Sequence, residues 1–143
     1  MRTMTLALGC LAMTVLTMTA QAAEVDQGDK PVETRVFEMR TYYAAPGKME
    51  ALHARFRNHT CKLLEKHGMT LVGFWAPTDA QQAEQKMVYI VAFPSRAAAE
   101  KSWQAFRADP EWLAAKEASE KNGVLVQKVE SIYLNPTDYS PIK

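Results

Sequence analysis

Four segments of the chain combine β-branched and aromatic residues with the short alternation that is typical of β-strands. They are residues 36–43, 71–76, 86–93 and 124–134. In the first segment Glu38, Arg40 and Tyr42 project to one face, and Phe37, Met39, Thr41 and Tyr43 project to the other. The third segment is apolar almost throughout, which predicts burial on both faces. We expect the second and third strands to form an antiparallel hairpin across a polar turn at residues 77–85.

Helical periodicity fills the intervals between these strands. Residues 48–67 predict one long helix that ends at Gly68, with its apolar stripe at Met49, Leu52, Phe56, Leu63 and His67. The opposite side carries Glu50, Arg55, Asn58, Lys62 and Glu65 and is expected to be polar. Two further helices are predicted at residues 95–108 and 110–121, with Ser95 and Asp109 as their N-caps.

The order of elements, βαββαβ, is that of the ferredoxin-like α+β fold. This fold has one four-stranded antiparallel sheet with the helices on one face. Because the third strand is apolar on both sides, the face without helices also needs to be covered. A second copy of the same sheet is the simplest cover, so the sequence predicts a homodimer with its sheets face to face.

The first 22 residues differ from the rest of the chain. Arg2 precedes an apolar run from Thr5 to Met18, and Ala20-Gln21-Ala22 follows it. This pattern predicts a signal peptide, residues 1–22, that is cleaved after Ala22 and directs the protein to the periplasm or the medium. The run is shorter than the ~20 residues of a membrane anchor, so no stable anchor is expected after processing. Residues 23–34 predict a flexible lead-in and residues 35–143 the folded domain.

Processing changes the charge and the thiol content of the chain. It lowers the count of Lys and Arg from 17 to 16, equal to the 16 Asp and Glu, so the mature net charge is zero. A neutral chain does not favour nucleic acid as a partner. Cys61 remains as the only cysteine, which excludes an internal disulfide. The sequence also lacks a phosphate-binding glycine loop and a Cys/His metal pattern, so no cofactor or metal is expected.

Several short motifs are shared with one known family. They are residues 36–42, 46–48, 58–60, 65–69, 71–75 and 109–112, in order and without large insertions. On these motifs the chain resembles the NIPSNAP family. The resemblance implies a dimeric α/β barrel, a fold also used by cofactor-free monooxygenases and haem-degrading enzymes. The family has no assigned biochemical activity, so the resemblance implies no reaction.

Five residues are candidates for a site. His59 lies in the shared His-Thr motif and is either a structural imidazole or a group that transfers a proton or bonds a ligand. Glu38, Arg40 and Tyr42 form either an ion pair within the dimer or, if their face lines the cavity, a site in which Arg40 holds an anion. Trp75 is expected to offer a flat surface to a planar ligand.

Three functions stay open at this point. The first is a dimeric module that binds a small hydrophobic or aromatic ligand. The second is a cofactor-independent monooxygenase or isomerase, with His59 as base and Arg40 stabilising an enolate-like anion. The third is a haem-binding protein with His59 or His67 as axial ligand.

Overall fold

The computed structural model describes residues 35–143, so the predicted signal peptide and lead-in lie outside the described residues. The elements are β1 (Val36–Ala44), α1 (Met49–Arg55), η1 (Phe56–Thr60), α2 (Cys61–Lys66), β2 (Thr70–Trp75), α3 (Ala80–Ala83), β3 (Lys86–Phe93), α4 (Arg96–Ala108), α5 (Pro110–Ser119) and β4 (Val126–Leu134). The predicted strands are confirmed to within two residues. The short helix α3 was not predicted; it lies inside the polar turn, where Asp79 caps it by accepting a hydrogen bond from the Gln82 N–H.

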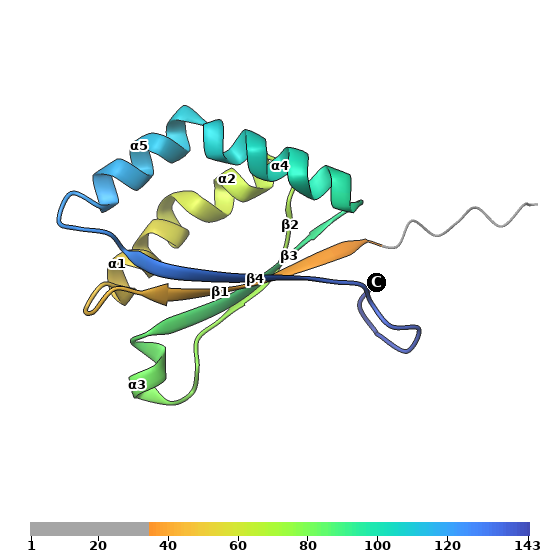
Figure 1. The fold of residues 1–143 in the computed structure, drawn as a ribbon, viewed down its shortest axis with the longest axis horizontal. Helices are drawn as coiled ribbons and strands as arrows, with labels where there is room; N and C mark the ends of the chain where they lie inside the picture. The colour runs from red at the N-terminus through yellow and green to blue at the C-terminus, as the bar shows by residue number, and fades with distance from the viewer. Residues whose placement is uncertain (1–34) are drawn as a thin grey trace, which may run out of the picture. The chain divides into compact units, whose positions relative to one another are not determined.

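The four strands form one antiparallel sheet in the order β2-β3-β1-β4, which confirms the ferredoxin-like fold. Helices α1 to α2 and α4 to α5 lie over the same face of this sheet (Figure 1). The opposite face, called the outer face below, carries the odd-numbered residues of β1. No helix among residues 35–143 is long and apolar enough to cross a membrane.

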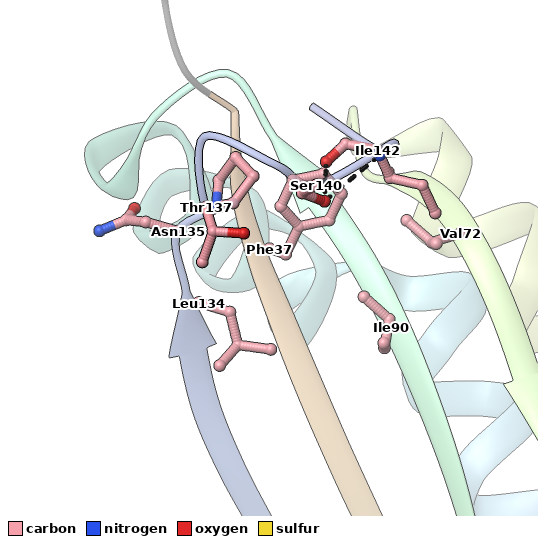
Figure 2. A pocket seen from close by; sticks show the side chains of 9 residues that line it. Phe37, Val72, Ile90, Leu134, Asn135, Thr137, Ser140 and Ile142 are labelled. Carbon is pink, nitrogen blue, oxygen red and sulfur yellow. Dashed lines mark hydrogen bonds between the residues drawn. The ribbon is translucent and has the colours of Figure 1, made fainter.

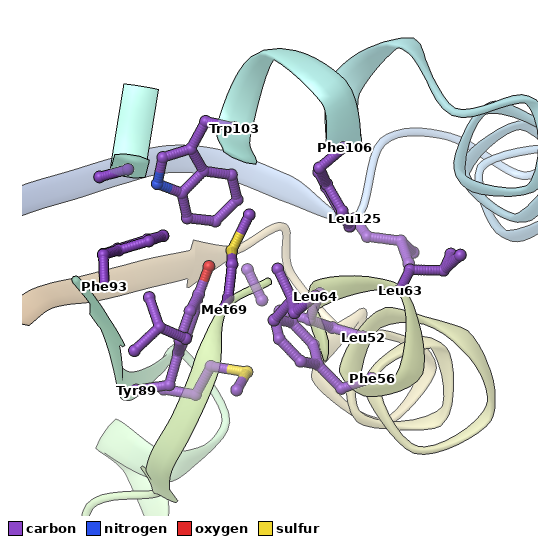
Figure 3. Packing of buried hydrophobic residues seen from close by; sticks show 14 of the residues in the cluster. Leu52, Phe56, Leu63, Leu64, Met69, Tyr89, Phe93, Trp103, Phe106 and Leu125 are labelled. Atoms are coloured by element: carbon purple, nitrogen blue, oxygen red, sulfur yellow. The ribbon is translucent and has the colours of Figure 1, made fainter. Parts of the chain in front are cut away.

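The hydrophobic core lies between the sheet and the helices (Figure 3). Its fully buried members include Leu52 and Leu64 from the first helical segment and Tyr89 and Phe93 from β3. Trp103 and Phe106 of α4, both buried, pack edge to face at a centroid distance of 5.6 Å. Burial of each such side chain contributes roughly 1.5–3 kcal/mol, so this layer holds the helices on the sheet.

The long first helix contains a π-helical turn, η1, which the sequence did not predict. In a regular α-helix His59 would share a face with Arg55 and Phe56, both of which are buried. The wider π turn puts Thr60 in that place, and the Thr60 hydroxyl donates to the Arg55 carbonyl over 3.3 Å. His59 is therefore exposed, and Cys61 is half-buried.

Arg55 is also a correction, because it was expected on the polar side and is only 5% exposed. Helix α5 packs over it. The Arg55 guanidinium donates to the Glu120 carboxylate over 2.9 Å and lies 5.2 Å from the Trp112 ring centroid. Because Glu120 and Trp112 lie far from Arg55 in the sequence, the local periodicity of the first helix could not predict these contacts.

The predicted helix ends are confirmed. Ser95 accepts from the Ala98 N–H, Asp109 accepts from the Glu111 N–H, and Gly68 has a φ of 77° at the end of α2. His67 Nε2 lies 2.7 Å from the Asp109 carboxylate and so ties the end of α2 to the start of α5.

Candidate functional site

Four polar side chains meet between β1, β4 and α4, and we call them the Glu38 cluster: Glu38, Arg40, Trp103 and Ser131. The Glu38 carboxylate, 1% exposed, accepts from Arg40 Nη1 over 2.9 Å and from the Ser131 hydroxyl over 2.5 Å. Its second oxygen accepts from Trp103 Nε1. These three donors satisfy a carboxylate that is shielded from water.

Arg40 is stacked as well as paired. Its guanidinium carbon lies 4.2 Å from the Trp103 ring centroid, while its buried Nε has no hydrogen-bond partner among the described residues. Burial lowers the pKa of Arg40, but Tyr42, Tyr89 and Glu38 outweigh it, so the net shift is upward. The sequence left two interpretations of Glu38 and Arg40 open, an ion pair or an anion-binding site. The structure shows the ion pair, and both partners belong to the same chain.

Tyr42 belongs to the aromatic core beside this cluster. The Tyr89 hydroxyl donates to the Tyr42 hydroxyl over 3.2 Å, and the Tyr42 and Phe56 rings meet edge to face at 5.8 Å. Burial, followed by Tyr42, raises the pKa of Tyr89 well above its ordinary value. Glu38, Arg40 and Tyr42 therefore face the helices and not the outer face, on which a cavity between two sheets would lie.

His59 lies elsewhere. It lines a shallow groove of about 330 Å³ between η1 and α5, together with Asn58, Arg55 and Ser119. Its ring has no hydrogen bond to another described residue, so nothing orients it as a base. Trp75 lies on the edge strand β2, 51% exposed, and neither it nor His59 contacts Arg40 in the described network. The five candidate residues from the sequence therefore lie in three separate places: the Glu38 cluster with the adjoining Tyr42, the groove beside α5, and the edge strand β2.

A further pocket lies on the outer face, beneath residues 135–142 (Figure 2). We call it the tail pocket. Its volume is about 300 Å³, and its apolar wall consists of Phe37, Val72, Ile90, Leu134, Pro136 and Ile142. Asn135, Thr137 and Ser140 supply its polar groups, and no charged residue lines it. This pocket was not predicted from the sequence.

The tail is held in place by exposed hydrogen bonds. The Lys143 ammonium donates to the carbonyls of Thr137 and Asp138, each over 2.6 Å, and Arg35 Nε donates to the Lys143 carbonyl over 2.9 Å. Exposed hydrogen bonds of this kind each contribute little to stability.

The family follows from a comparison of this chain with family models. The NIPSNAP model matches residues 37–141, which includes β1, the whole helical layer and most of the tail. The chain belongs to the NIPSNAP family. The resemblance drawn from its motifs is thereby confirmed. None of the curated proteins matches the chain.

Solved structures of NIPSNAP proteins share this fold. A NIPSNAP family protein of unknown function from Agrobacterium tumefaciens is 22% identical, covers 78% of this chain and 96% of its own, and has a TM-score of 0.66. An uncharacterized NIPSNAP domain protein from Burkholderia xenovorans is 21% identical, with 74% and 98% covered and a TM-score of 0.62. At these identities the likeness shows the fold alone.

Proposed function

We propose that this NIPSNAP domain is an exported, homodimeric protein that binds a small, uncharged hydrophobic or aromatic molecule in the tail pocket. The observation that carries the proposal is the pocket itself. Its volume lies at the lower end of the ~300–1,000 Å³ found for ligand sites, and its wall is apolar with a few polar groups on one side. The absence of charged residues from its lining favours a neutral ligand.

The outer face supports the dimer. Beside the tail pocket it exposes a patch of apolar side chains, which includes Trp75 and Ile132, both half-exposed. Apolar patches of this kind are typical of interfaces. At its other end the face is polar, where the Tyr43 hydroxyl and the Lys128 ammonium both donate to Glu130. A face with an apolar patch next to a polar region suits a second sheet, which would also close the open side of the pocket.

The enzyme and haem alternatives have less support. His59 and Arg40 lie in different places, and the Arg40 guanidinium is already paired with Glu38, so no base and anion-binding group converge. His67 Nε2 is engaged with Asp109, and the described residues hold no group of three or more His, Cys, Asp or Glu placed to bind a metal ion. Export is supported by the leader sequence.

The test is a titration with N-phenyl-1-naphthylamine, a neutral apolar fluorophore, of the protein and two variants. Ile90→Phe places extra bulk in the tail pocket, whereas Val88→Phe adds the same ring to the same face of β3 without lining the pocket. We expect saturable binding that Ile90→Phe weakens about tenfold or more and that Val88→Phe preserves. Equal affinity of the two variants, or no binding to the parent protein, contradicts the proposal.

A further inference from the structure

A second cavity opens on the helix-facing side of the sheet, between β2 and the first helical segment. We call it the edge pocket. Its volume is about 380 Å³, and it is lined by Phe56, Phe74, Trp75, His53, Arg57 and Cys61, with Ala76 and Met87 completing it. It shares no residue with the tail pocket, so a ligand there is independent of the ligand proposed for that pocket.

The wall of the edge pocket is built from aromatic rings. Phe56 and Phe74 meet edge to face at 5.7 Å, and Phe74 stacks on Tyr89 at 5.3 Å, which fixes the ring that faces the pocket. These two fixed rings offer flat and edge-on surfaces that suit a planar aromatic molecule. Trp75 borders the pocket from the edge of β2, and its indole folds back over Gly73 on the outer face, where a Cβ atom would lie only 2.7 Å from the ring.

The polar groups of the edge pocket are basic or neutral. Arg57 is well exposed, and its ion pair with Glu50 at 2.9 Å is a surface pair that contributes little, so the guanidinium is available to another anion. No acidic residue lines the pocket. Burial, followed by the Glu65 carboxylate, raises the pKa of the Cys61 thiol, which adds a neutral, polarisable wall in place of a thiolate.

We infer that the edge pocket binds a planar aromatic anion, with the ring against Phe56 and Phe74 and the acid group on Arg57. The charge of the lining favours an anion over a cation, because the pocket is lined by the cationic Arg57 and by His53 but by no acidic side chain. The shape of the wall selects the ring. The tail pocket lacks charge, so the two sites differ in the class of ligand they take.

Cys61 provides a direct readout, because a ligand in the edge pocket covers it. In the full chain with Cys10→Ser, alkylation of Cys61 by iodoacetamide at pH 8 is measured with increasing 2-naphthoate or its neutral match, 2-naphthamide. We expect 2-naphthoate to slow alkylation saturably, and 2-naphthamide to act about tenfold more weakly because it lacks the charge. The comparison needs no second substitution and so does not depend on how a variant folds.

Two substitutions locate the effect. Arg57→Gln removes the charge from the pocket and is expected to abolish the preference for 2-naphthoate, whereas Lys62→Gln removes an exposed charge from the same helical segment and is expected to preserve it. Ile90→Phe, in the tail pocket, leaves the protection unchanged. The inference is overturned if neither probe slows alkylation, if both act equally, or if the preference survives Arg57→Gln.

Discussion

Substitution of Glu38 by Gln tests the buried ion pair on which β1, β4 and α4 converge. The amide keeps the size of the carboxylate but removes its charge. Its NH₂ group is itself a donor, so it cannot accept the hydrogen bonds from Arg40 and Ser131 or from Trp103 that the replaced oxygen accepted. Loss of one partner of a buried pair costs about 3–5 kcal/mol. Because the Arg40 side chain retains 18% exposure, we expect a loss near the lower end, about 3 kcal/mol of unfolding free energy.

The assay is urea unfolding followed by tryptophan fluorescence. Glu130→Gln is the matched control, because it removes a half-exposed carboxylate from β4 and is expected to change stability far less than Glu38→Gln does. A second variant, Glu38→Leu with Arg40→Met, replaces the pair by apolar groups and is expected to recover much of the loss. A loss below about 1 kcal/mol for Glu38→Gln refutes the argument that this carboxylate neutralises a buried cation.

Two other substitutions have defined outcomes. Hydrogen bonds from Lys66 and His67 hold the pKa of the Asp109 carboxyl well below its usual range. The ionised carboxylate therefore stabilises the folded state at pH values above the unfolded pKa of about 4, and this contribution is lost as the pH falls below that value. Urea unfolding at pH 7, 5 and 3 should therefore show a stability gap between the protein and Asp109→Asn that narrows only at pH 3, whereas a constant gap contradicts this. Gly73→Ala is expected to displace the Trp75 indole and shift its fluorescence emission, and an unchanged spectrum would show that the ring does not lie over the glycine.

Much of the fold could be predicted because its signals are local. Period-two alternation gave the strands, and turn and cap residues such as Ser95 and Gly68 gave the ends of the helices. The π turn could not be predicted, because Thr60 closes it through a bond to a backbone carbonyl, and Thr60 carries no local signal that separates it from an α-helical residue. Arg55 was misplaced for a related reason, since its partner Glu120 lies on another helix.

The candidate sites were harder to predict than the fold. Alternation assigned Glu38, Arg40 and Tyr42 to one face, but both faces of β1 carry aromatic residues, so the pattern did not show which face meets the helices. The tail pocket depends on Phe37 and Ile142, which lie near the two ends of the domain and meet only in the folded chain. Pockets of this kind are set by tertiary packing and leave no motif in the sequence.

Native mass spectrometry of the protein purified from the exporting compartment tests the central claim, a ligand-binding homodimer, most directly. The account predicts a dimer whose chains begin at Ala23 and which carries a small neutral molecule that dissociates on activation in the gas phase. Ile90→Phe should give the same processed chain without that molecule. A ligand-free monomer in the spectrum of the parent protein would contradict the account.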